Sequence, residues 1–188
     1  MKTNRSQYFV LGLILFLSIN SFAQTEDYKE PALPIDQETK LISYSKIIEV
    51  TANKDSLYKK GQMWFRKFYK NPTGVIRESD TISGKILGKH QIKILNPTDK
   101  KGIQTMKGIT QYSVNTYYKD NKVRIVLTEI NLTAASYTPI EKWQDKTAKD
   151  FTTKNYFYLE QIDKQMNEIL VDFEKFMKEP AKAKKDEW

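Results

Sequence analysis

Residues 112–127, YSVNTYYKDNKVRIVL, contain two runs of alternating side chains separated by the charged segment KDNK. Alternation with a period of two is typical of strands that bury one face. Asp120 and Asn121 stand at the centre of the charged segment, and both residue types tolerate the positive φ of a tight turn. The stretch therefore predicts a β-hairpin. Beyond it the alternation shifts to Ile130 and Leu132, and one extra residue there predicts a β-bulge.

Three further strands are predicted upstream of this hairpin. Residues 42–50 place most of their apolar side chains on one parity, which predicts a central strand. Residues 75–80 and 82–94 predict two successive strands. Gly84 and Gly88 interrupt the second of these strands, and glycines at such positions indicate bulges or a sharp bend.

A helix is predicted between the first two strands, from Asn53 to about Tyr69. Asn53 is a favoured N-cap, and Asp55 in the first turn complements the helix dipole. The apolar stripe consists of Leu57, Gly61, Trp64, Phe65 and Phe68. Because glycine costs about 1 kcal/mol of helix propensity relative to alanine, Gly61 in this stripe predicts a close contact with the sheet. The breakers of residues 71–74 end the helix.

A second helix is predicted from Thr153 to Lys178 and is stopped by Pro180. Its apolar residues are spaced three and four apart, at Leu159, Ile162, Met166, Ile169, Phe173 and Phe176. This spacing fits either a coiled-coil dimer seam or a helix packed on its own sheet. The pattern lasts about two and a half heptads, fewer than a coiled coil needs, and Leu170 and Met177 widen the stripe. We therefore expect intramolecular packing, and a monomer rather than a dimer.

The predicted order of one strand, one helix, several strands and a final helix indicates an α+β fold. We expect an antiparallel sheet of about five strands with its helices on one face. The expected units are a signal peptide at 1–23, a flexible lead-in at 24–40, the α+β domain at 41–133, a loop plus C-terminal helix packed on the same domain at 134–180, and a charged tail at 181–188.

The N-terminus has the features of a secretory leader. Lys2 and Arg5 precede an uncharged apolar stretch at 8–19, and Ser21-Phe22-Ala23 supplies the small residues of a cleavage site. We expect cleavage after Ala23 and an exported protein, periplasmic or extracellular, that does not span a membrane once cleaved. An uncleaved anchor is the alternative, although the stretch is shorter than the ~20 residues of a spanning helix.

Composition excludes several classes of chemistry. The chain has 188 residues and no cysteine, so disulfides, thiol catalysis and thiolate metal sites are excluded and stability must come from the core. The formal net charge of +8 suggests affinity for polyanions, which for an exported protein are envelope glycans and lipid head groups. The charges are interspersed with carboxylates, and this pattern favours plain solubility as the simpler interpretation.

Three stretches together carry a family resemblance. They are the helix start at 53–58 followed by Trp64, the glycine-containing strand region at 77–88, and the hairpin at 112–124. They resemble domain-of-unknown-function family 4468, a bacterial exported family with a TATA-binding-protein-like (TBP-like) fold, over about residues 42–133. The resemblance implies a sheet with a helix across its concave side and implies no activity. It does not imply DNA binding, because TATA-box recognition uses a saddle of two repeats and only one is found here.

Few residues of the sequence are candidates for catalysis. His90 is the single histidine and accompanies no nucleophile-elbow serine, which disfavours a Ser-His-Asp triad and a zinc centre. Glu78 and Asp80 share one side of a strand, which fits a paired-carboxylate site, a weak calcium site or a solvated edge. No phosphate-binding loop or dinucleotide motif occurs. We expect no cofactor, no metal and no enzymatic activity, with an acid–base hydrolase as the alternative.

Six aromatic residues are candidates for ligand binding: Trp64, Phe68, Tyr112, Tyr117, Tyr118 and Trp143. Aromatic walls suit an apolar or glycan ligand, whereas aromatic residues at helical or alternating spacing commonly belong to the core. The sequence therefore predicts a non-enzymatic module that binds an envelope protein, glycan or lipid, and no nucleic acid. The alternative is a carrier of a small apolar ligand held between helix and sheet.

Overall fold

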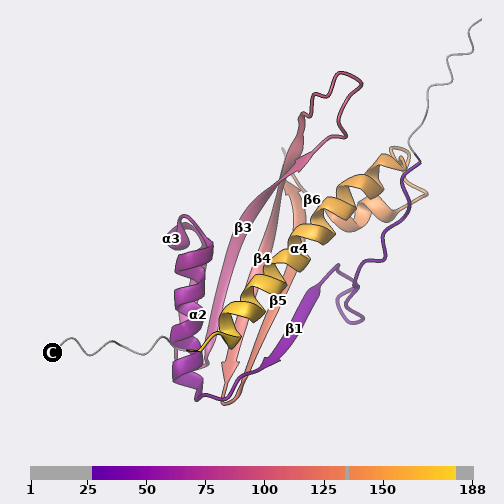
Figure 1. The fold of residues 1–188 in the computed structure, drawn as a ribbon. Helices are drawn as coiled ribbons and strands as arrows, with labels where there is room; N and C mark the ends of the chain where they lie inside the picture. The colour runs from indigo at the N-terminus through magenta and orange to yellow at the C-terminus, as the bar shows by residue number, and fades with distance from the viewer. Residues whose placement is uncertain (1–26, 134–135, 181–188) are drawn as a thin grey trace, which may run out of the picture.

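The computed structural model of the protein describes residues 27–133 and 136–180 (Figure 1). The predicted signal peptide at 1–23 and charged tail at 181–188 lie outside the described residues. In chain order the elements are β1 (Tyr44–Glu49), α2 (Lys54–Phe68), α3 (Pro72–Val75), β2 (Ile76–Asp80), β3 (Lys85–Leu95), β4 (Met106–Lys119), β5 (Lys122–Thr133), β6 (Tyr137–Pro139), the 3-10 helix η1 (Ile140–Gln144) and α4 (Lys154–Lys178).

The strands form one six-stranded antiparallel sheet in the order β1-β5-β4-β3-β2, with β6 paired to β5. The α+β class, the antiparallel sheet and the long C-terminal helix predicted from the sequence are confirmed. The prediction of a central strand at residues 42–50 is wrong, because β1 lies at the edge of the sheet and pairs with β5 alone. The sixth strand, β6, was not predicted. Its three residues include Pro139, and so short a segment shows no alternation that could reveal a strand.

The hairpin predicted from residues 112–127 is present as β4 and β5. At its turn Asn121 adopts the positive φ of 60° that the residue type permits. The ladder between β4 and β5 shifts register between Gln111 and Ser113, opposite a segment of β5 in which Glu129 has a φ of 51°. The β-bulge predicted beyond the hairpin is therefore confirmed.

Helix α2 begins and packs as its sequence predicts. The side chain of Asn53 accepts the Ser56 N–H at 2.8 Å, as an N-cap does. A Cβ placed on Gly61 would lie 1.9 Å from the Tyr118 hydroxyl, so this glycine allows the close contact with β4. Residues 71–74 were expected only to end the helix, but Pro72–Val75 forms the single-turn helix α3, and the strand predicted from residue 75 begins at Ile76.

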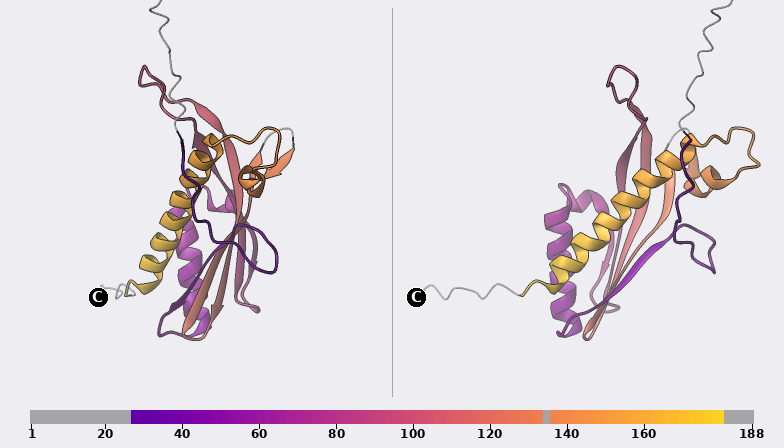
Figure 2. Two further views of the ribbon diagram at one scale, coloured as in Figure 1. Left: turned by 90° about the vertical axis from the view of Figure 1, so that its right-hand side faces the viewer. Right: turned by 45° about the vertical axis from the view of Figure 1, so that its right-hand side comes forward.

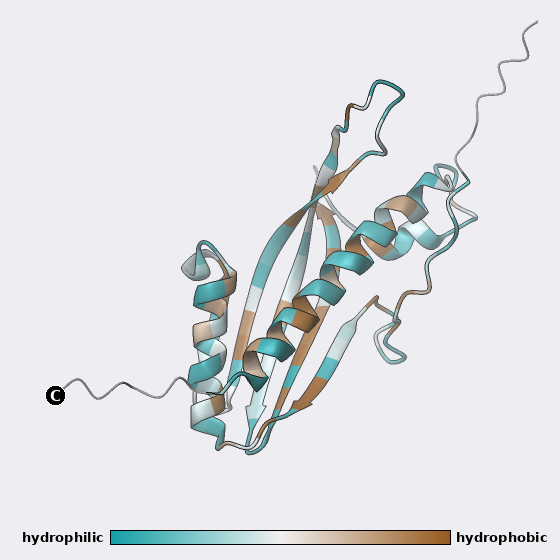
Figure 3. Ribbon diagram, viewed as in Figure 1, coloured by the Kyte–Doolittle hydropathy of each residue, from teal (hydrophilic) through white to brown (hydrophobic). Residues whose placement is uncertain are grey.

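Helices α2 and α4 lie on the same face of the sheet, and α4 crosses the strands diagonally (Figures 1 and 2). Hydropathy alternates along the strands, and α4 turns hydrophilic residues outward (Figure 3). The apolar stripe of α4 is buried within this one chain, as intramolecular packing requires; it comprises Tyr156, Tyr158, Leu159, Ile162, Met166, Ile169, Leu170, Phe173 and Met177. None of the helices in the described ranges is long and apolar enough to cross a membrane.

The described part of the lead-in, residues 27–40, approaches β1 through a turn. Ile35 forms an isolated bridge with Ile42. The Asp36 carboxylate accepts the Thr39 N–H at 2.8 Å, and this hydrogen bond lowers the pKa of Asp36. Leu41, which follows this turn, consequently lies next to the sheet.

Candidate functional site

The side of the sheet that faces away from α2 and α4 is the open face. Val123, Ile125 and Leu127 of β5 are fully buried under the helices, so pleating turns the residues between them to the open face. Ile47 and Tyr117 are 59% and 36% exposed there. The open face comprises Ser45, Ile47 and Glu49 of β1, Lys122, Arg124 and Val126 of β5, Ser113, Asn115, Tyr117 and Lys119 of β4, and Lys85, Leu87, Lys89, Gln91 and Lys93 of β3.

The open face is basic. Its cations are Lys85, Lys89, Lys93, Lys119, Lys122 and Arg124. Ion pairs join Lys85 to Glu78 at 2.8 Å, Lys89 to Glu129 at 3.8 Å and Lys122 to Glu49 at 4.0 Å. The hydrogen bond to Glu78 raises the pKa of Lys85. Lys93, Lys119 and Arg124 have no ion pair within the described ranges, although Arg124 donates its Nε–H to the Ser45 hydroxyl at 3.3 Å and its charge acts on Asp36.

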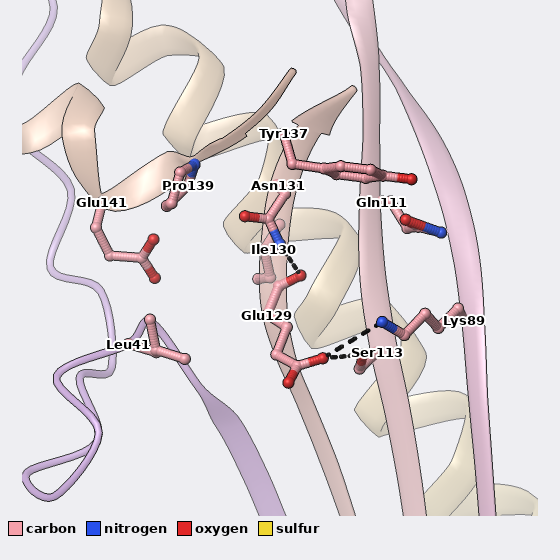
Figure 4. A pocket seen from close by; sticks show the side chains of 10 residues that line it. All are labelled: Leu41, Lys89, Gln111, Ser113, Glu129, Ile130, Asn131, Tyr137, Pro139 and Glu141. Atoms are coloured by element: carbon pink, nitrogen blue, oxygen red, sulfur yellow. Dashed lines mark hydrogen bonds and ion pairs between the residues drawn. The ribbon is translucent and has the colours of Figure 1, made fainter. Parts of the chain in front are cut away.

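A hollow lies where two short strands share one edge of β5. β1 pairs with β5 up to Leu127, and β6 pairs with it from Asn131 onward, so a gap separates the two partners. The hollow occupies this gap and extends onto the open face, with a volume of about 540 Å³ (Figure 4). This hollow, the notch, is lined by Leu41, Lys89, Gln111, Ser113, Glu129, Ile130, Asn131, Tyr137, Pro139 and Glu141.

Glu129 lies in the bulge at one side of the notch. Its positive φ is a conformation that residues with a side chain seldom adopt. Its carboxylate accepts the Ser113 hydroxyl at 2.6 Å and lies 3.8 Å from the Lys89 ammonium, while its carbonyl accepts the Asn131 amide at 2.7 Å. These contacts fix an unfavourable backbone conformation that presents the carboxylate to the notch (Figure 4).

Glu141 reaches the notch from η1, on the side opposite Glu129 (Figure 4). One carboxylate oxygen, Oε1, accepts the backbone N–H of Ile42 at 2.7 Å. The other, Oε2, is buried and has no hydrogen-bond partner among the described residues. Leaving a buried carboxylate oxygen without a donor is energetically costly, so this oxygen gains free energy from any donor that reaches it.

Four of the six aromatic candidates fill the layer between the helices and the sheet. Trp64, Tyr112 and Tyr118 are 0%, 1% and 1% exposed. Phe68 stacks on Trp64 with ring centroids 4.9 Å apart and is partly exposed at the edge of this layer. Trp64, Tyr112 and Tyr118 belong to the core, Phe68 packs at its edge, and none of the four lines the notch.

The other two candidates lie apart from each other. Tyr117 is on the open face, directly across the ladder from Arg124. Trp143, in η1, contacts the Tyr158 ring at a centroid distance of 5.5 Å. It lines a second hollow of about 920 Å³ near the start of α4. The structure therefore does not gather the six aromatic candidates into one site.

The candidate catalytic residues are engaged in other interactions. His90 is half-buried on the helix side of β3, where its ring contacts Tyr69 and burial lowers its pKa. Glu78 pairs with Lys85, whereas Asp80 accepts backbone N–H groups of the turn that follows it. No group of three or more His, Cys, Asp or Glu residues in the described ranges is arranged to hold a metal ion.

Sequence reasoning missed the two carboxylates of the notch. The shift of alternation beyond the hairpin located the bulge, and the polar residue in that bulge, Glu129, could have been singled out from it. Glu141 reaches the notch only because β6 pairs with β5 and carries η1 to this place. No local pattern in the sequence indicates that pairing.

A family model and one solved structure agree with this fold. Residues 44–133 match the model of a family described as a domain of unknown function (DUF4468) with TBP-like fold. A crystal structure of a DUF4468 family protein from Bacteroides ovatus superposes with a TM-score of 0.61 at 15% identity, covering 80% of this chain and 92% of that one. A TBP-like protein from Parabacteroides distasonis gives 0.49 at 16% identity, covering 72% and 95%. No curated protein matches this chain.

Proposed function

We propose that this protein, whose residues 44–133 match the model of the DUF4468 family, is an exported, non-enzymatic module that binds an envelope component or a partner protein. The open face of the sheet is the binding surface. One observation carries the proposal: this face combines the unpaired cations Lys93, Lys119 and Arg124 with the exposed side chains of Ile47 and Tyr117. Apolar and aromatic side chains among charges are typical of a surface that meets another molecule.

Export is supported by the N-terminal sequence, which has the charged, apolar and small-residue segments of a leader in the usual order. N-terminal sequencing of the protein isolated from the cells that produce it tests this part of the proposal. We expect the chain to start at Gln24. A chain that starts at Met1 in the cytoplasmic fraction would contradict export.

The non-enzymatic assignment is supported by the separate engagement of Glu78 and Asp80, which occupy an ion pair and a turn. The carrier hypothesis gains no comparable support, because Trp64 and Tyr118 fill the layer between helix and sheet. Native mass spectrometry of the protein, purified without denaturation, tests the carrier hypothesis directly. We expect the mass of the chain alone; a dissociable apolar ligand would favour a carrier.

Charge reversal tests the binding surface. The variant Lys93→Glu/Lys119→Glu/Arg124→Glu alters exposed side chains of the open face only. A matched control, Lys59→Glu/Arg66→Glu/Lys164→Glu, makes the same exchanges at exposed positions on α2 and α4. We expect the first variant to lose retention on the isolated cell-envelope fraction and the control to keep it. Equal retention of the two variants, or equal loss, would contradict the assignment of the open face.

A further inference from the structure

Hydrogen-bonding side chains from β3, β4, β5 and η1 surround the notch (Figure 4). The amides of Gln111 and Asn131 supply both donors and acceptors, Glu129 and Glu141 supply acceptors, and Lys89 supplies a donor. Its volume of about 540 Å³ is within the usual range of small-ligand sites. The notch therefore has the size and the polar groups to orient a small, strongly hydrogen-bonding ligand.

Charge selects against anions in the notch. Lys89 is its one cation and opposes two carboxylates, those of Glu129 and Glu141. Glu129 is already compensated by the Ser113 hydroxyl and the Lys89 ammonium. The uncompensated group is Oε2 of Glu141. A charged or neutral donor on the ligand, an ammonium or a hydroxyl, is the chemistry that satisfies a carboxylate oxygen, and a cationic donor does so more strongly.

An aromatic ring lies beside these polar groups. Tyr137 is 61% exposed, and its ring extends across one end of the notch above the Gln111 side chain (Figure 4). Leu41 and Pro139 add apolar walls. A sugar ring matches this combination, because its C–H face packs on an aromatic ring while its hydroxyls engage planar amide and carboxylate groups.

We propose that the notch binds a hexosamine unit of a glycan. The Glu141 side chain turns into the notch so that its buried Oε2 meets the protonated amine, the hydroxyls meet the amides of Gln111 and Asn131, and the sugar ring packs against Tyr137. This inference rests on the proposed function, since the notch is one end of the open face, and it names the ligand class for that end of the surface.

A titration followed by two-dimensional amide NMR tests the inference on the purified protein. The probes are glucosamine, glucose and cyclohexylamine at mildly acidic pH. Glucosamine combines an ammonium with hydroxyls, and each of the other two offers only one of these. We expect glucosamine to shift the resonances of Gln111, Glu129 and Asn131, and glucose and cyclohexylamine each to act more weakly. An equal effect of cyclohexylamine, or shifts elsewhere in the protein, would overturn the proposal.

The variant Glu141→Gln isolates the key oxygen. It retains a carbonyl oxygen for the Ile42 N–H and replaces the unpaired acceptor by a donor. Because a hydrogen bond to a charged group is worth about 1.5–3 kcal/mol, we expect glucosamine affinity to fall at least about tenfold. The control Glu160→Gln, at an exposed position of α4, should bind as the unchanged protein does. Unchanged affinity of Glu141→Gln would contradict the site.

A second variant covers the case in which Glu141→Gln fails to fold. Glu129→Gly relieves the positive φ at the bulge and removes the second carboxylate, so the folded notch should bind glucosamine more weakly.

The charge-reversal experiment separates the two proposals. Loss of envelope retention by the open-face variant, without glucosamine binding, would defeat the hexosamine site alone. Glucosamine binding without that dependence would defeat the wider open-face assignment.

Discussion

The indole Nε1–H of Trp64 in α2 donates a hydrogen bond to the carboxylate of Asp172 in α4, with a donor–acceptor distance of 2.7 Å. Trp64 is fully buried, and its ring also meets Phe173 edge-on with centroids 4.8 Å apart. This pair joins the two helices that cover one face of the sheet. The joined helices leave the opposite face as the broad surface available to a partner.

Removing the Asp172 carboxylate should destabilise the protein. Asp172→Ala leaves the buried indole N–H of Trp64 without its acceptor, so we expect a loss of about 1–3 kcal/mol in the free energy of unfolding. Asp172→Asn keeps an acceptor and should cost less. Urea denaturation measures both variants, with Val171→Ala as an exposed neighbour expected to change stability by no more than about 0.5 kcal/mol. Equal effects of Asp172→Ala and Val171→Ala would show that the hydrogen bond contributes nothing.

Gly61→Ala should destabilise α2 although alanine is the better helix former. The added methyl would overlap the Tyr118 hydroxyl, which itself donates to Thr116 Oγ1 at 3.0 Å. Overpacking of this kind costs about 1–3 kcal/mol, more than the roughly 1 kcal/mol of propensity gained. Thermal denaturation should show a lower midpoint than for the control Lys59→Ala, which alters an exposed position. A higher midpoint for Gly61→Ala would mean that Tyr118 moves aside freely.

His90 should make stability depend on pH in the mildly acidic range. Burial against Tyr69 and Tyr112 lowers the pKa of His90 in the folded state below its usual 6.5, so the unfolded chain binds a proton first. The contribution of neutral His90 to the free energy of unfolding is complete above about pH 6.5. It is lost as pH falls from there, by at most about 1.4 kcal/mol per pH unit. The variant His90→Gln should flatten this slope.

Four carboxylates have lowered pKa values: Asp36, Asp80, Asp145 and Glu174. They make stability depend on pH in a more acidic range than His90 does, because their usual pKa values lie near 4. They contribute to stability above that range and lose their contribution as pH falls through it.

A control for the His90 prediction adds Gln91→His to His90→Gln. It returns a histidine at an exposed position and should not restore the pH slope of stability. Restoration of the slope would show that burial is not its cause.

The apolar stripe of α4 should be essential to the folded monomer. Met166 and Phe173 are both 0% exposed within the single chain. Replacing each with Asp buries a charge or exposes the core, and we expect a loss of more than about 4 kcal/mol and therefore unfolding. Circular dichroism and size-exclusion chromatography measure the outcome. A folded monomer obtained from a dimeric parent would instead identify the stripe as a dimer seam.

The parts of the fold that local chemistry determines could be predicted from the sequence. The Asn53 cap, the close contact at Gly61 and the bulge near Glu129 each leave a mark in the residues themselves: a capping side chain, a misplaced glycine and a shift of alternation. The notch leaves no such mark. Its gap exists because β1 and β6 pair with the same edge of β5, and that choice depends on long-range packing.

The aromatic candidates show the same limit on what the sequence can predict. Tyr117 and Tyr118 are adjacent, so pleating sends one to the open face and the other to the core. Only the position of the helices decides which side is buried. Trp64 and Trp143 likewise differ in their neighbours and not in any local pattern. Residue type therefore identifies the candidates, and tertiary packing decides which of them are buried.

Site-specific photo-cross-linking tests the open-face assignment most directly, because the chain has no cysteine of its own. Ile47→Cys on the open face and Val171→Cys on α4 replace apolar residues that are 59% and 61% exposed. Each variant is labelled with a benzophenone maleimide and irradiated with the isolated envelope fraction. We predict a discrete cross-linked product from Ile47→Cys and none from Val171→Cys. The same product from both variants, or a product from Val171→Cys alone, would contradict the open face as the binding surface.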